Sequence, residues 1–288
     1  MKKTLLVSTV LLASLALAAC SSSSSSSTAA VASPSSSAAA CTPTTLKTLT
    51  ANQLTIGTDD PAYGPWFDSN TPSNGKGFES AVAYAVAAKL GYTKDQVVWV
   101  KAPFNTVIQP GVKPFDLDIN QVSITPERKN AVDFTSGYYD VAQAIITVKG
   151  SKIAHAKSIA DLKNAKLGAQ LGTTSYTTIT DVIKPKNKPA VFDSNDIAKQ
   201  ALGNGQIDGL VVDLPTAFYI TAVDLKNGLI IGQFAPGAGG EQFGMVLTKG
   251  SPITTCVSTA VDALRADNTL AGIASTWLAT TVGAPVLK

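Results

Sequence analysis

Strand-like and helix-like stretches alternate along most of this 288-residue chain, and the alternation restricts the folds that it can adopt. Residues 54–58 form a short β-prone run. In 78–90 apolar residues recur every four positions, which predicts a helix that Gly91 ends. Strands are expected next at 96–100 and 115–122. This α/β order is typical of mainly parallel sheets with helices on both faces.

A second βα series begins near Ser158 and predicts a second lobe. In this half of the chain we expect strands at 142–148, 166–170, 206–212 and 242–248, and helices at 159–163, from about 176, at 195–202, at 215–223 and in two stretches from 253. Ligands of open α/β sheets bind beyond the carboxyl ends of the strands. The residues at those ends are therefore the candidates for a binding site.

Four polar clusters follow the predicted strands. They are the loop 59–67, the turn from Ser123 to Arg128, the segment 172–175 that follows the strand ending near Gln170, and Asp213. The residues that we expect to contact a ligand are Asp60, Tyr63, Trp66, Gln121, Ser123, Arg128, Gln170, Thr173, Thr174, Ser175 and Asp213. We expect Asp59 to be a structural acceptor within its loop.

The chemistry of these clusters suits a zwitterion. Thr125 and Pro126 predict a helix start, and a cation in its first turn, Arg128, is disfavoured there unless it has another role. The arginine fork matches a carboxylate, and the carboxylate of Asp213 suits an ammonium. Each residue alone has an ordinary structural explanation, as a surface arginine, a helix cap or a core aromatic. Their joint location at strand ends favours an α-amino acid site.

The N-terminal sequence is typical of an export signal. Lys2 and Lys3 precede a short apolar run, and residues 1–19 are predicted to be a signal peptide, too short to span a membrane well. The residues 17–20 (LAAC) resemble a bacterial lipobox, which implies cleavage before Cys20 and acylation of that cysteine, palmitate included. An ordinary signal peptide is the alternative. The serine-rich segment that follows, within 20–45, reads as a flexible tether and favours the lipoprotein.

The remaining cysteines and the net charge further restrict the class of protein to which this chain can belong. If Cys20 carries lipid, Cys41 and Cys256 form an even pair, which favours a disulfide in an exported protein over two free thiols. Their surroundings do not suggest a metal site. Loss of Lys2 and Lys3 lowers the formal net charge of +3 by two, so nothing in the charge favours a nucleic-acid partner. No cofactor is expected.

Between about Leu54 and Trp277 the chain resembles the bacterial extracellular solute-binding proteins of family 3, the polar amino-acid receptors of ABC importers. The ITPER turn and the VDF and GYY segments are its most specific markers. The resemblance also rests on LTIGTDDPAYGPWF, GKGFESAVAYAVAAKLG, LGAQLGTTSY, QALGNGQIDGLVVD and QFGMVLTKGS.

The resemblance implies a type II periplasmic-binding-protein fold, in which two α/β lobes are joined by two crossing strands and close on the ligand. Those crossings would fall near 142–148 and 240–248. The first lobe would then comprise 46–143 and 244–288, and the second lobe 144–243.

It also implies roles for particular residues. Arg128 would bind the ligand carboxylate with help from Thr173, beside which Thr174 and Ser175 lie. Asp213 and Ser123 would contact the ammonium, and Tyr63 would cover the ligand. Asp60 aligns with a first-loop acid that approaches the side chain of basic ligands, so we expect a basic or polar amino acid.

Three positions depart from the family pattern. Gln121 stands where glycine or serine is usual, Glu79 replaces an aspartate, and Trp66 replaces a phenylalanine. A long amide at position 121 would protrude into the cleft and read the ligand side chain or shrink the pocket.

The expected partners are an amino acid, a membrane permease and the lipid anchor. The expected state is a monomer, on the outer face of the cell membrane or in a periplasm. A sensor that binds an amino acid in order to signal is an alternative with the same site. An exported enzyme of this fold, such as a dehydratase, is another, but the single histidine, His155, lies in a polar stretch and no catalytic set can be drawn.

Overall fold

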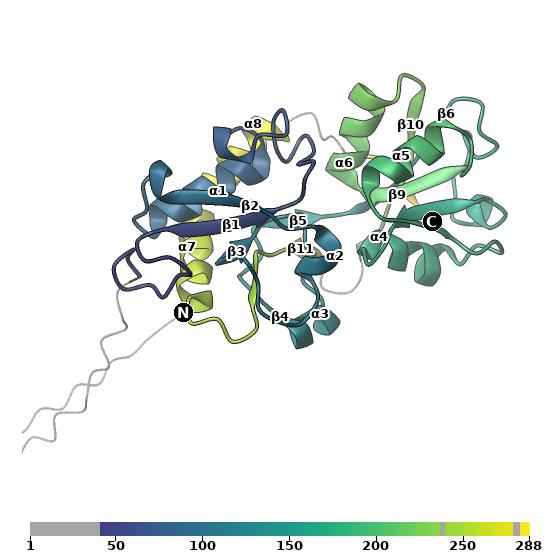
Figure 1. Cartoon of the computed structure of the whole chain (residues 1–288). Helices are drawn as coiled ribbons and strands as arrows, with labels where there is room; N and C mark the ends of the chain where they lie inside the picture. The colour runs from purple at the N-terminus through teal and green to yellow at the C-terminus, as the bar shows by residue number, and fades with distance from the viewer. Residues whose placement is uncertain (1–40, 237–239, 279–282) are drawn as a thin grey trace, which may run out of the picture. The chain divides into compact units, whose positions relative to one another are not determined.

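The computed structural model describes residues 41–236, 240–278 and 283–288, which belong to one compact unit of two α/β lobes (Figure 1). The predicted signal peptide, Cys20 and most of the predicted tether lie outside the described residues. No helix in the described part of the chain is both long enough and apolar enough to span a bilayer.

The first lobe is built on a five-stranded sheet with the order β2-β1-β3-β12-β4. Its strands are β1 (Leu54–Thr58), β2 (Val97–Lys101), β3 (Leu117–Asp118), β12 (Val246–Thr248) and β4 (Val132–Phe134). β1 runs parallel to β2 and β3, whereas β12 runs antiparallel to β3 and β4. The alternation of strands and helices predicted this mainly parallel arrangement.

Helices cover both faces of that sheet. The helices of this lobe are α1 (Phe78–Lys89), α2 (Phe104–Val107), α3 (Pro126–Ala131), α7 (Thr254–Ala266) and α8 (Thr269–Trp277), with short 3₁₀ turns at Pro72–Asn74 and Lys94–Gln96. The predicted stripe of α1 is buried, with Phe78, Val82 and Val86 all inaccessible to solvent. A smaller apolar cluster that includes Phe104 and Val107 fills the α2 side.

The second lobe contains a six-stranded sheet with the order β13-β10-β6-β9-β7-β8. Its strands are β6 (Gln143–Val148), β7 (Leu167–Gln170), β8 (Ala190–Phe192), β9 (Gly209–Asp213), β10 (Gly228–Phe234) and β13 (Val286–Leu287). Its helical segments are Ala160–Leu162, α4 (Thr174–Thr177) continued by Thr178–Ile183, α5 (Asn195–Gly203), and α6 (Leu214–Tyr219) continued by Ile220–Asp224.

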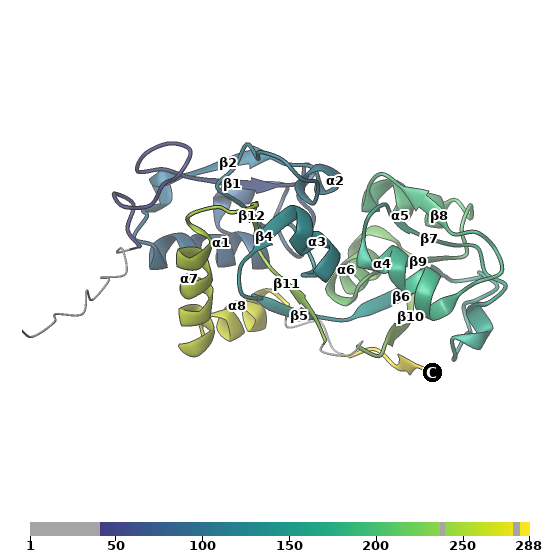
Figure 2. The same cartoon turned by 90° about the horizontal axis from the view of Figure 1, so that it is seen from below.

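Two crossing strands join the lobes. β5 (Tyr139–Val141) pairs antiparallel with β11 (Glu241–Phe243), and Figure 2 shows them running side by side between the two sheets. The chain passes from β5 directly into β6, and from β11 into β12. The first crossing therefore begins a few residues before the expected range, and the second falls within it.

The C-terminal residues correct the expected lobe boundary. Residues 244–288 were assigned to the first lobe, but β13 pairs in parallel with β10 of the second sheet. Leu287 is buried in the core of that lobe. Gly232 makes room for this strand, because a side chain at that position would collide with the carbonyl oxygen of Pro285. The last residues of the chain thus belong to the second lobe.

Cys41 and Cys256 form a disulfide, with a sequence separation of 215 and a Cα–Cα distance of 5.6 Å. The bond ties the start of the described chain to α7. The structure therefore contains the pairing that the cysteine count favoured.

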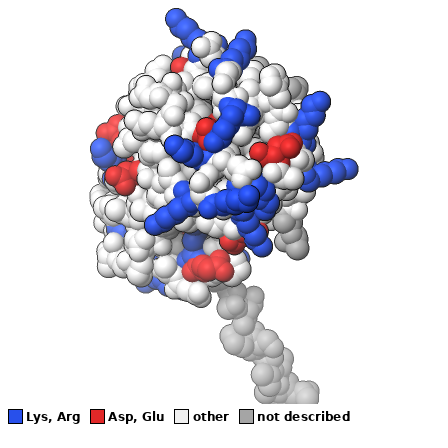
Figure 3. Space-filling model, turned by 90° about the vertical axis from the view of Figure 1, so that its right-hand side faces the viewer, with Lys and Arg blue, Asp and Glu red and all other residues white. Residues whose placement is uncertain are grey.

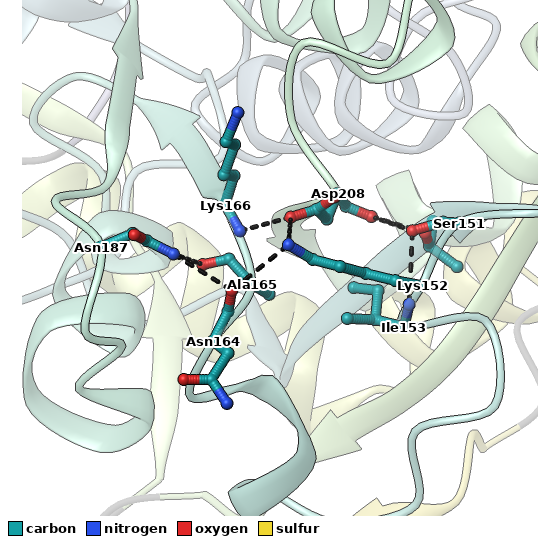
Figure 4. Close-up of polar contacts among 9 residues, drawn as sticks. Ser151, Lys152, Ile153, Asn164, Ala165, Lys166, Asn187 and Asp208 are labelled. Carbon is teal, nitrogen blue, oxygen red and sulfur yellow. Dashed lines mark hydrogen bonds and ion pairs between the residues drawn. The ribbon is translucent and has the colours of Figure 1, made fainter.

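The outer end of the second lobe is rich in lysine, and Figure 3 shows that Lys and Arg outnumber Asp and Glu on that face. Asp208 organises the loops there (Figure 4). Its carboxylate accepts a hydrogen bond from the backbone N–H of Lys166 at 2.5 Å and pairs with Lys152 at 2.9 Å. Its carbonyl accepts from Ser151 Oγ at 3.1 Å. These contacts fix the turn that leads into β9, the strand that ends at Asp213.

Candidate functional site

A cavity between the lobes brings the strand-end clusters together. It encloses about 420 Å³ of empty space, part of it open to solvent. It is lined by Asp59, Tyr63, Phe104, Asn120, Gln121, Ser123, Arg128, Gln170, Thr173, Thr174, Ser175, Asn195 and Asp213. All the residues that were predicted to contact a ligand line it, except Asp60 and Trp66.

Arg128 is held in the wall of the cavity by both lobes. Thr125 caps α3, and its Oγ1 accepts from the backbone N–H of Arg128 at 3.2 Å. The guanidinium donates through Nη1 to the carbonyl of Ser123 at 2.6 Å and through Nη2 to the carbonyl of Gly172 at 2.8 Å. It also lies over the ring of Phe104, 5.5 Å from its centroid. These contacts fix the position of the fork in the wall of the cavity.

The charge of Arg128 is balanced by acids of the site. Burial lowers the pKa of Arg128 from its ordinary value, and the carboxylates of Glu241 and Asp213 oppose that shift. Only 9% of the residue's surface is exposed. A desolvated cation beside an open cavity has strong electrostatic attraction for an anion.

Asp213 ends β9 and supplies the opposite charge. Gln143 lies opposite Asp213 in the β6–β9 ladder and donates through Nε2 to Asp213 Oδ1 at 2.6 Å. Burial raises the pKa of Asp213 well above its ordinary value, and the nearby charge of Glu241 adds to this. A cation bound in the cavity would favour the ionised form of Asp213 and so lower its pKa.

Glu241 is the acid that the sequence analysis missed. It lies on the crossing strand β11, and its carboxylate accepts from Ser123 Oγ at 2.5 Å and from Thr174 Oγ1 at 2.6 Å. The same group accepts from Gln143 Nε2 at 3.1 and 3.2 Å. Glu241 is the first residue of a crossing strand, so a rule about the carboxyl ends of strands does not point to it, and only the folded arrangement identifies it.

The segment after β7 contributes its predicted hydroxyls. Thr173 caps α4: its Oγ1 accepts from the backbone N–H of Tyr176 at 3.2 Å and donates to the carbonyl of Gln170 at 2.7 Å. Ser175 Oγ donates to Gln143 Oε1 at 2.6 Å. The hydroxyl protons of this segment are therefore already directed at protein groups.

The two acids of the first loop lie the other way round from the expectation. Asp60 was expected to face the ligand, but it is exposed and pairs with Lys101 at 3.2 Å, away from the cavity. Asp59 lines the cavity instead, and it also accepts from the backbone N–H of Asp60 at 2.9 Å. Burial raises the pKa of Asp59 above its ordinary value. In an irregular loop no periodicity tells which of two adjacent side chains faces inward.

Trp66 belongs to the core. Its surface is fully buried, and its ring packs edge-on against Phe78 and Phe243 with centroids 5.9 and 5.6 Å apart. Its indole Nε1 donates to Thr216 Oγ1 of the second lobe at 2.9 Å. Trp66 therefore ties the lobes together beside the site rather than lining the cavity.

Gln121 lines the cavity, but its side-chain amide donates to the buried Glu79 instead of protruding into the cleft as expected, and its backbone adopts a conformation that is rare outside glycine. Its φ angle is 49°, and its backbone N–H donates to Glu79 Oε1 at 2.7 Å. The family pattern of a small residue at 121 fits this backbone, whereas Gln121 needs a partner to hold it there.

Phe104, Asn120 and Asn195 line the cavity without having been predicted. Phe104 and Asn195 follow the ends of β2 and β8, so the strand-end rule, applied to those strands as well, identifies them. No group of three or more His, Cys, Asp or Glu side chains within 41–236, 240–278 and 283–288 is arranged to hold a metal ion.

Comparison with known proteins assigns the chain to a family. The family model for bacterial extracellular solute-binding proteins, family 3, matches residues 54–280. A probable histidine-binding protein of Campylobacter jejuni is 32% identical over 201 residues, which cover 68% of this chain and 72% of that protein. An L-arginine-binding protein of Pseudomonas aeruginosa is 28% identical over 222 residues, 72% of this chain and 80% of that protein.

Solved structures agree with this assignment. An ancestral arginine-binding protein bound to arginine is 31% identical, with a TM-score of 0.65 over 78% of this chain and 97% of that one. The corresponding complex with glutamine has a TM-score of 0.66 over the same shares, also at 31% identity. The chain described here belongs to the bacterial extracellular solute-binding proteins of family 3.

Proposed function

We propose that this protein binds an amino acid in the cavity between its lobes and delivers it to an ABC importer in the membrane. The observation that carries the proposal is the pair of opposite charges, Arg128 and Asp213, on one cavity. A zwitterion supplies the partner of each charge at once. The relatives named as histidine- and arginine-binding proteins support the proposal.

The ligand we propose is a basic amino acid, with a polar one such as glutamine as the nearest alternative. Three carboxylates, Asp59, Asp213 and Glu241, lie at or beside the cavity, and among the described residues that line it Arg128 is the one cation. After Arg128 takes the ligand carboxylate and Asp213 its ammonium, Asp59 remains for a side-chain cation. The ring of Phe104 provides an apolar surface for the stem of such a side chain.

Binding would couple to closure of the lobes. Ser123, Arg128 and Tyr63 belong to the first lobe, whereas Thr173 and Asp213 belong to the second. A ligand that contacts both sets stabilises the closed arrangement over an open one. The bond from Arg128 to Gly172 already crosses between the lobes beside the cavity.

For the location we propose export and attachment by lipid at Cys20, as a monomer on the outer face of the membrane or in a periplasm. The LAAC sequence and the serine-rich segment after it support this. Metabolic labelling with a palmitate analogue tests it: the label is expected on the wild type and lost in Cys20→Ala. Labelling that persists in the variant would contradict it.

We also propose a binding role rather than an enzymatic one, which the relatives named as binding proteins support. Purified protein that turned over a prephenate-like substrate would contradict it.

A thermal-shift screen of the twenty amino acids, followed by titration calorimetry, tests the main proposal. A ligand at 100 times its Kd adds about 2.7 kcal/mol of apparent stability. Arginine, lysine or histidine is expected to raise Tm most. The proposal fails if no amino acid raises Tm or gives a heat of binding.

A further inference from the structure

Glu241 joins the two halves of the site from a strand that belongs to neither sheet. Its Oε1 accepts from Ser123 Oγ of the first lobe at 2.5 Å and from Thr174 Oγ1 of the second lobe at 2.6 Å. The two hydroxyl oxygens are themselves 3.3 Å apart. Both hydroxyl-bearing residues line the cavity, and Glu241 approaches them from the crossing ribbon.

The direction of these hydrogen bonds limits what the two hydroxyls can do for a ligand. A serine or threonine hydroxyl has one proton and two lone pairs, and a carboxylate only accepts. Ser123 and Thr174 each direct their proton at Glu241. Only lone pairs remain on both oxygens for a group in the cavity, so both are acceptors toward the ligand.

Gln143 extends the same pattern to Asp213. Its Nε2 carries two protons. It donates one to Asp213 Oδ1 at 2.6 Å and shares the other between Glu241, at 3.1 and 3.2 Å, and Thr174 Oγ1, at 3.3 Å. Its Oε1 in turn accepts from Ser175. The amide therefore holds the two carboxylates in a fixed relation and leaves no free N–H on that side.

We propose that Glu241 is a positioning residue, which makes Ser123 and Thr174 hydrogen-bond acceptors and so reserves this side of the cavity for the ammonium of the ligand. An ammonium has three N–H donors, and Ser123 Oγ, Thr174 Oγ1 and the carboxylate of Asp213 are three acceptors. The ligand carboxylate is refused on this side and directed to Arg128. The proposal rests on the amino-acid binding proposed above and adds how the site tells the two ends of the ligand apart.

A purely structural role for Glu241 makes a different prediction. If Glu241 only linked the lobes, its loss would weaken every ligand by the same factor. If it sets the direction of the hydroxyl protons, its loss weakens only ligands that carry an ammonium. The ratio of two affinities therefore separates the roles.

The experiment compares L-arginine with 5-guanidinopentanoic acid, which keeps the carboxylate and the guanidinium but lacks the ammonium. In Glu241→Gln the affinity for L-arginine, measured by calorimetry, is expected to fall about 10- to 100-fold, as for hydrogen bonds to a charged group. The affinity for the analogue is expected to change less than about threefold. Equal losses for both ligands, which would leave the ratio of the two affinities unchanged, would overturn the proposal.

Glu127→Gln is the matched control. Glu127 is exposed, and its charge also acts on Arg128, but it takes no part in the contacts of Ser123 or Thr174. The ratio of affinities is expected to stay at the wild-type value. A shift like that of Glu241→Gln would show that charge alone explains the effect, which contradicts a positioning role.

The variant Thr174→Val provides an independent measurement of the ratio of affinities. It can be used even if Glu241→Gln does not fold. It is expected to weaken L-arginine but not the analogue, and equal losses contradict the proposal. Where both variants fold, the effect of Glu241→Gln should be smaller in the Thr174→Val background, because the two act through one bond. If glutamine raises Tm more than arginine does, the same comparison is made with glutamine and 4-carbamoylbutanoic acid, which lacks the ammonium, in place of L-arginine and 5-guanidinopentanoic acid. A wild type that binds no amino acid refutes the proposed function instead.

Discussion

Gln121 donates from its backbone N–H to Glu79 Oε1 at 2.7 Å, and its side-chain amide donates to the other oxygen of the same carboxyl group. The two residues are 42 positions apart. Tyr138 also donates to Glu79, which is fully buried on α1. A buried acid therefore holds Gln121, and with it one wall of the cavity, in a left-handed conformation.

Glu79 should make the stability of the protein depend on pH. Burial raises its pKa from 4.5 to about 7, against the hydrogen bonds from Tyr138 and Gln121. Because the folded pKa is the higher one, the contribution of Glu79 is complete below about 4.5 and is lost as the pH rises through about 7. The loss amounts to roughly 3 kcal/mol, at 1.36 kcal/mol for each pKa unit.

Urea unfolding of the wild type and of Glu79→Gln at pH 5, 6, 7 and 8 measures this contribution. The wild type should lose free energy of unfolding over the range, and Glu79→Gln should lose less. Asp118 and Asp213 also have raised pKa values through burial and contribute with the same sign. Because the charge of Glu79 raises both, the difference between the two proteins measures Glu79 together with its effect on these two carboxyl groups. Parallel pH curves for the two proteins would show that Glu79 has no such role.

Arg128→Ala should abolish measurable amino-acid binding. The guanidinium is buried beside the cavity, and truncating one partner of a buried charge pair costs about 2–5 kcal/mol, or roughly 30-fold and more in affinity. The wild-type ligand found in the thermal-shift screen is titrated by calorimetry into the variant. Tight binding that survives the substitution would refute the role of Arg128.

The variant Arg128→Lys distinguishes the contribution of the positive charge from that of the planar guanidinium. It keeps a cation but cannot make the two parallel bonds of a guanidinium with a carboxylate. We expect affinity between those of the wild type and Arg128→Ala. Near-ultraviolet circular dichroism of each variant checks that the fold is retained.

The strand-end rule predicted most of the site because it depends on local patterns. Ser123, Gln170 and Asp213 lie within or just beyond short apolar runs, and parallel strands place their carboxyl ends at one edge of a sheet. The rule did not identify Glu241 and Gln143, because Glu241 begins the crossing strand β11 and Gln143 begins β6, so neither lies at the carboxyl end of a strand. Only tertiary packing brings that crossing against the cavity.

In the fold, too, elements with a local sequence pattern were predicted, and elements that depend on tertiary packing were not. Long periodic segments such as α1 were predicted from sequence, whereas the two-residue strand β13 was not. Two residues carry no periodicity, and the pairing of β13 with β10 depends on the space above Gly232. Prediction from pattern therefore fails for so short an element unless a longer alternating run surrounds it, as residues 115–122 surround the two-residue strand β3.

The disulfide between Cys41 and Cys256 should contribute substantially to stability. It closes a long loop, with 215 residues of sequence separation, and removal of a native disulfide commonly costs about 2–5 kcal/mol. The double variant Cys41→Ser/Cys256→Ser should unfold at lower urea concentration, with the Kd for the amino acid within about threefold of the wild type, because neither cysteine lines the cavity. A midpoint equal to that of the wild type would contradict this.

The two acids of the first loop offer a matched test of which one reads the ligand side chain. Asp59 lines the cavity, whereas Asp60 is exposed and pairs with Lys101. Both substitutions, Asp59→Asn and Asp60→Asn, remove one negative charge from adjacent positions. Asp59→Asn should weaken arginine or lysine at least about 10-fold, which corresponds to about 1.4 kcal/mol, because a desolvated cation loses its partner. Asp59→Asn should weaken the binding of glutamine much less, since the glutamine side chain carries no charge.

Asp60→Asn should change neither affinity by more than about twofold, because solvent and salt screen an exposed pair. Calorimetry with both ligands on both variants decides the matter: a selective loss in Asp60→Asn, or equal losses for both ligands in Asp59→Asn, would exclude Asp59 as the residue that recognises a basic side chain.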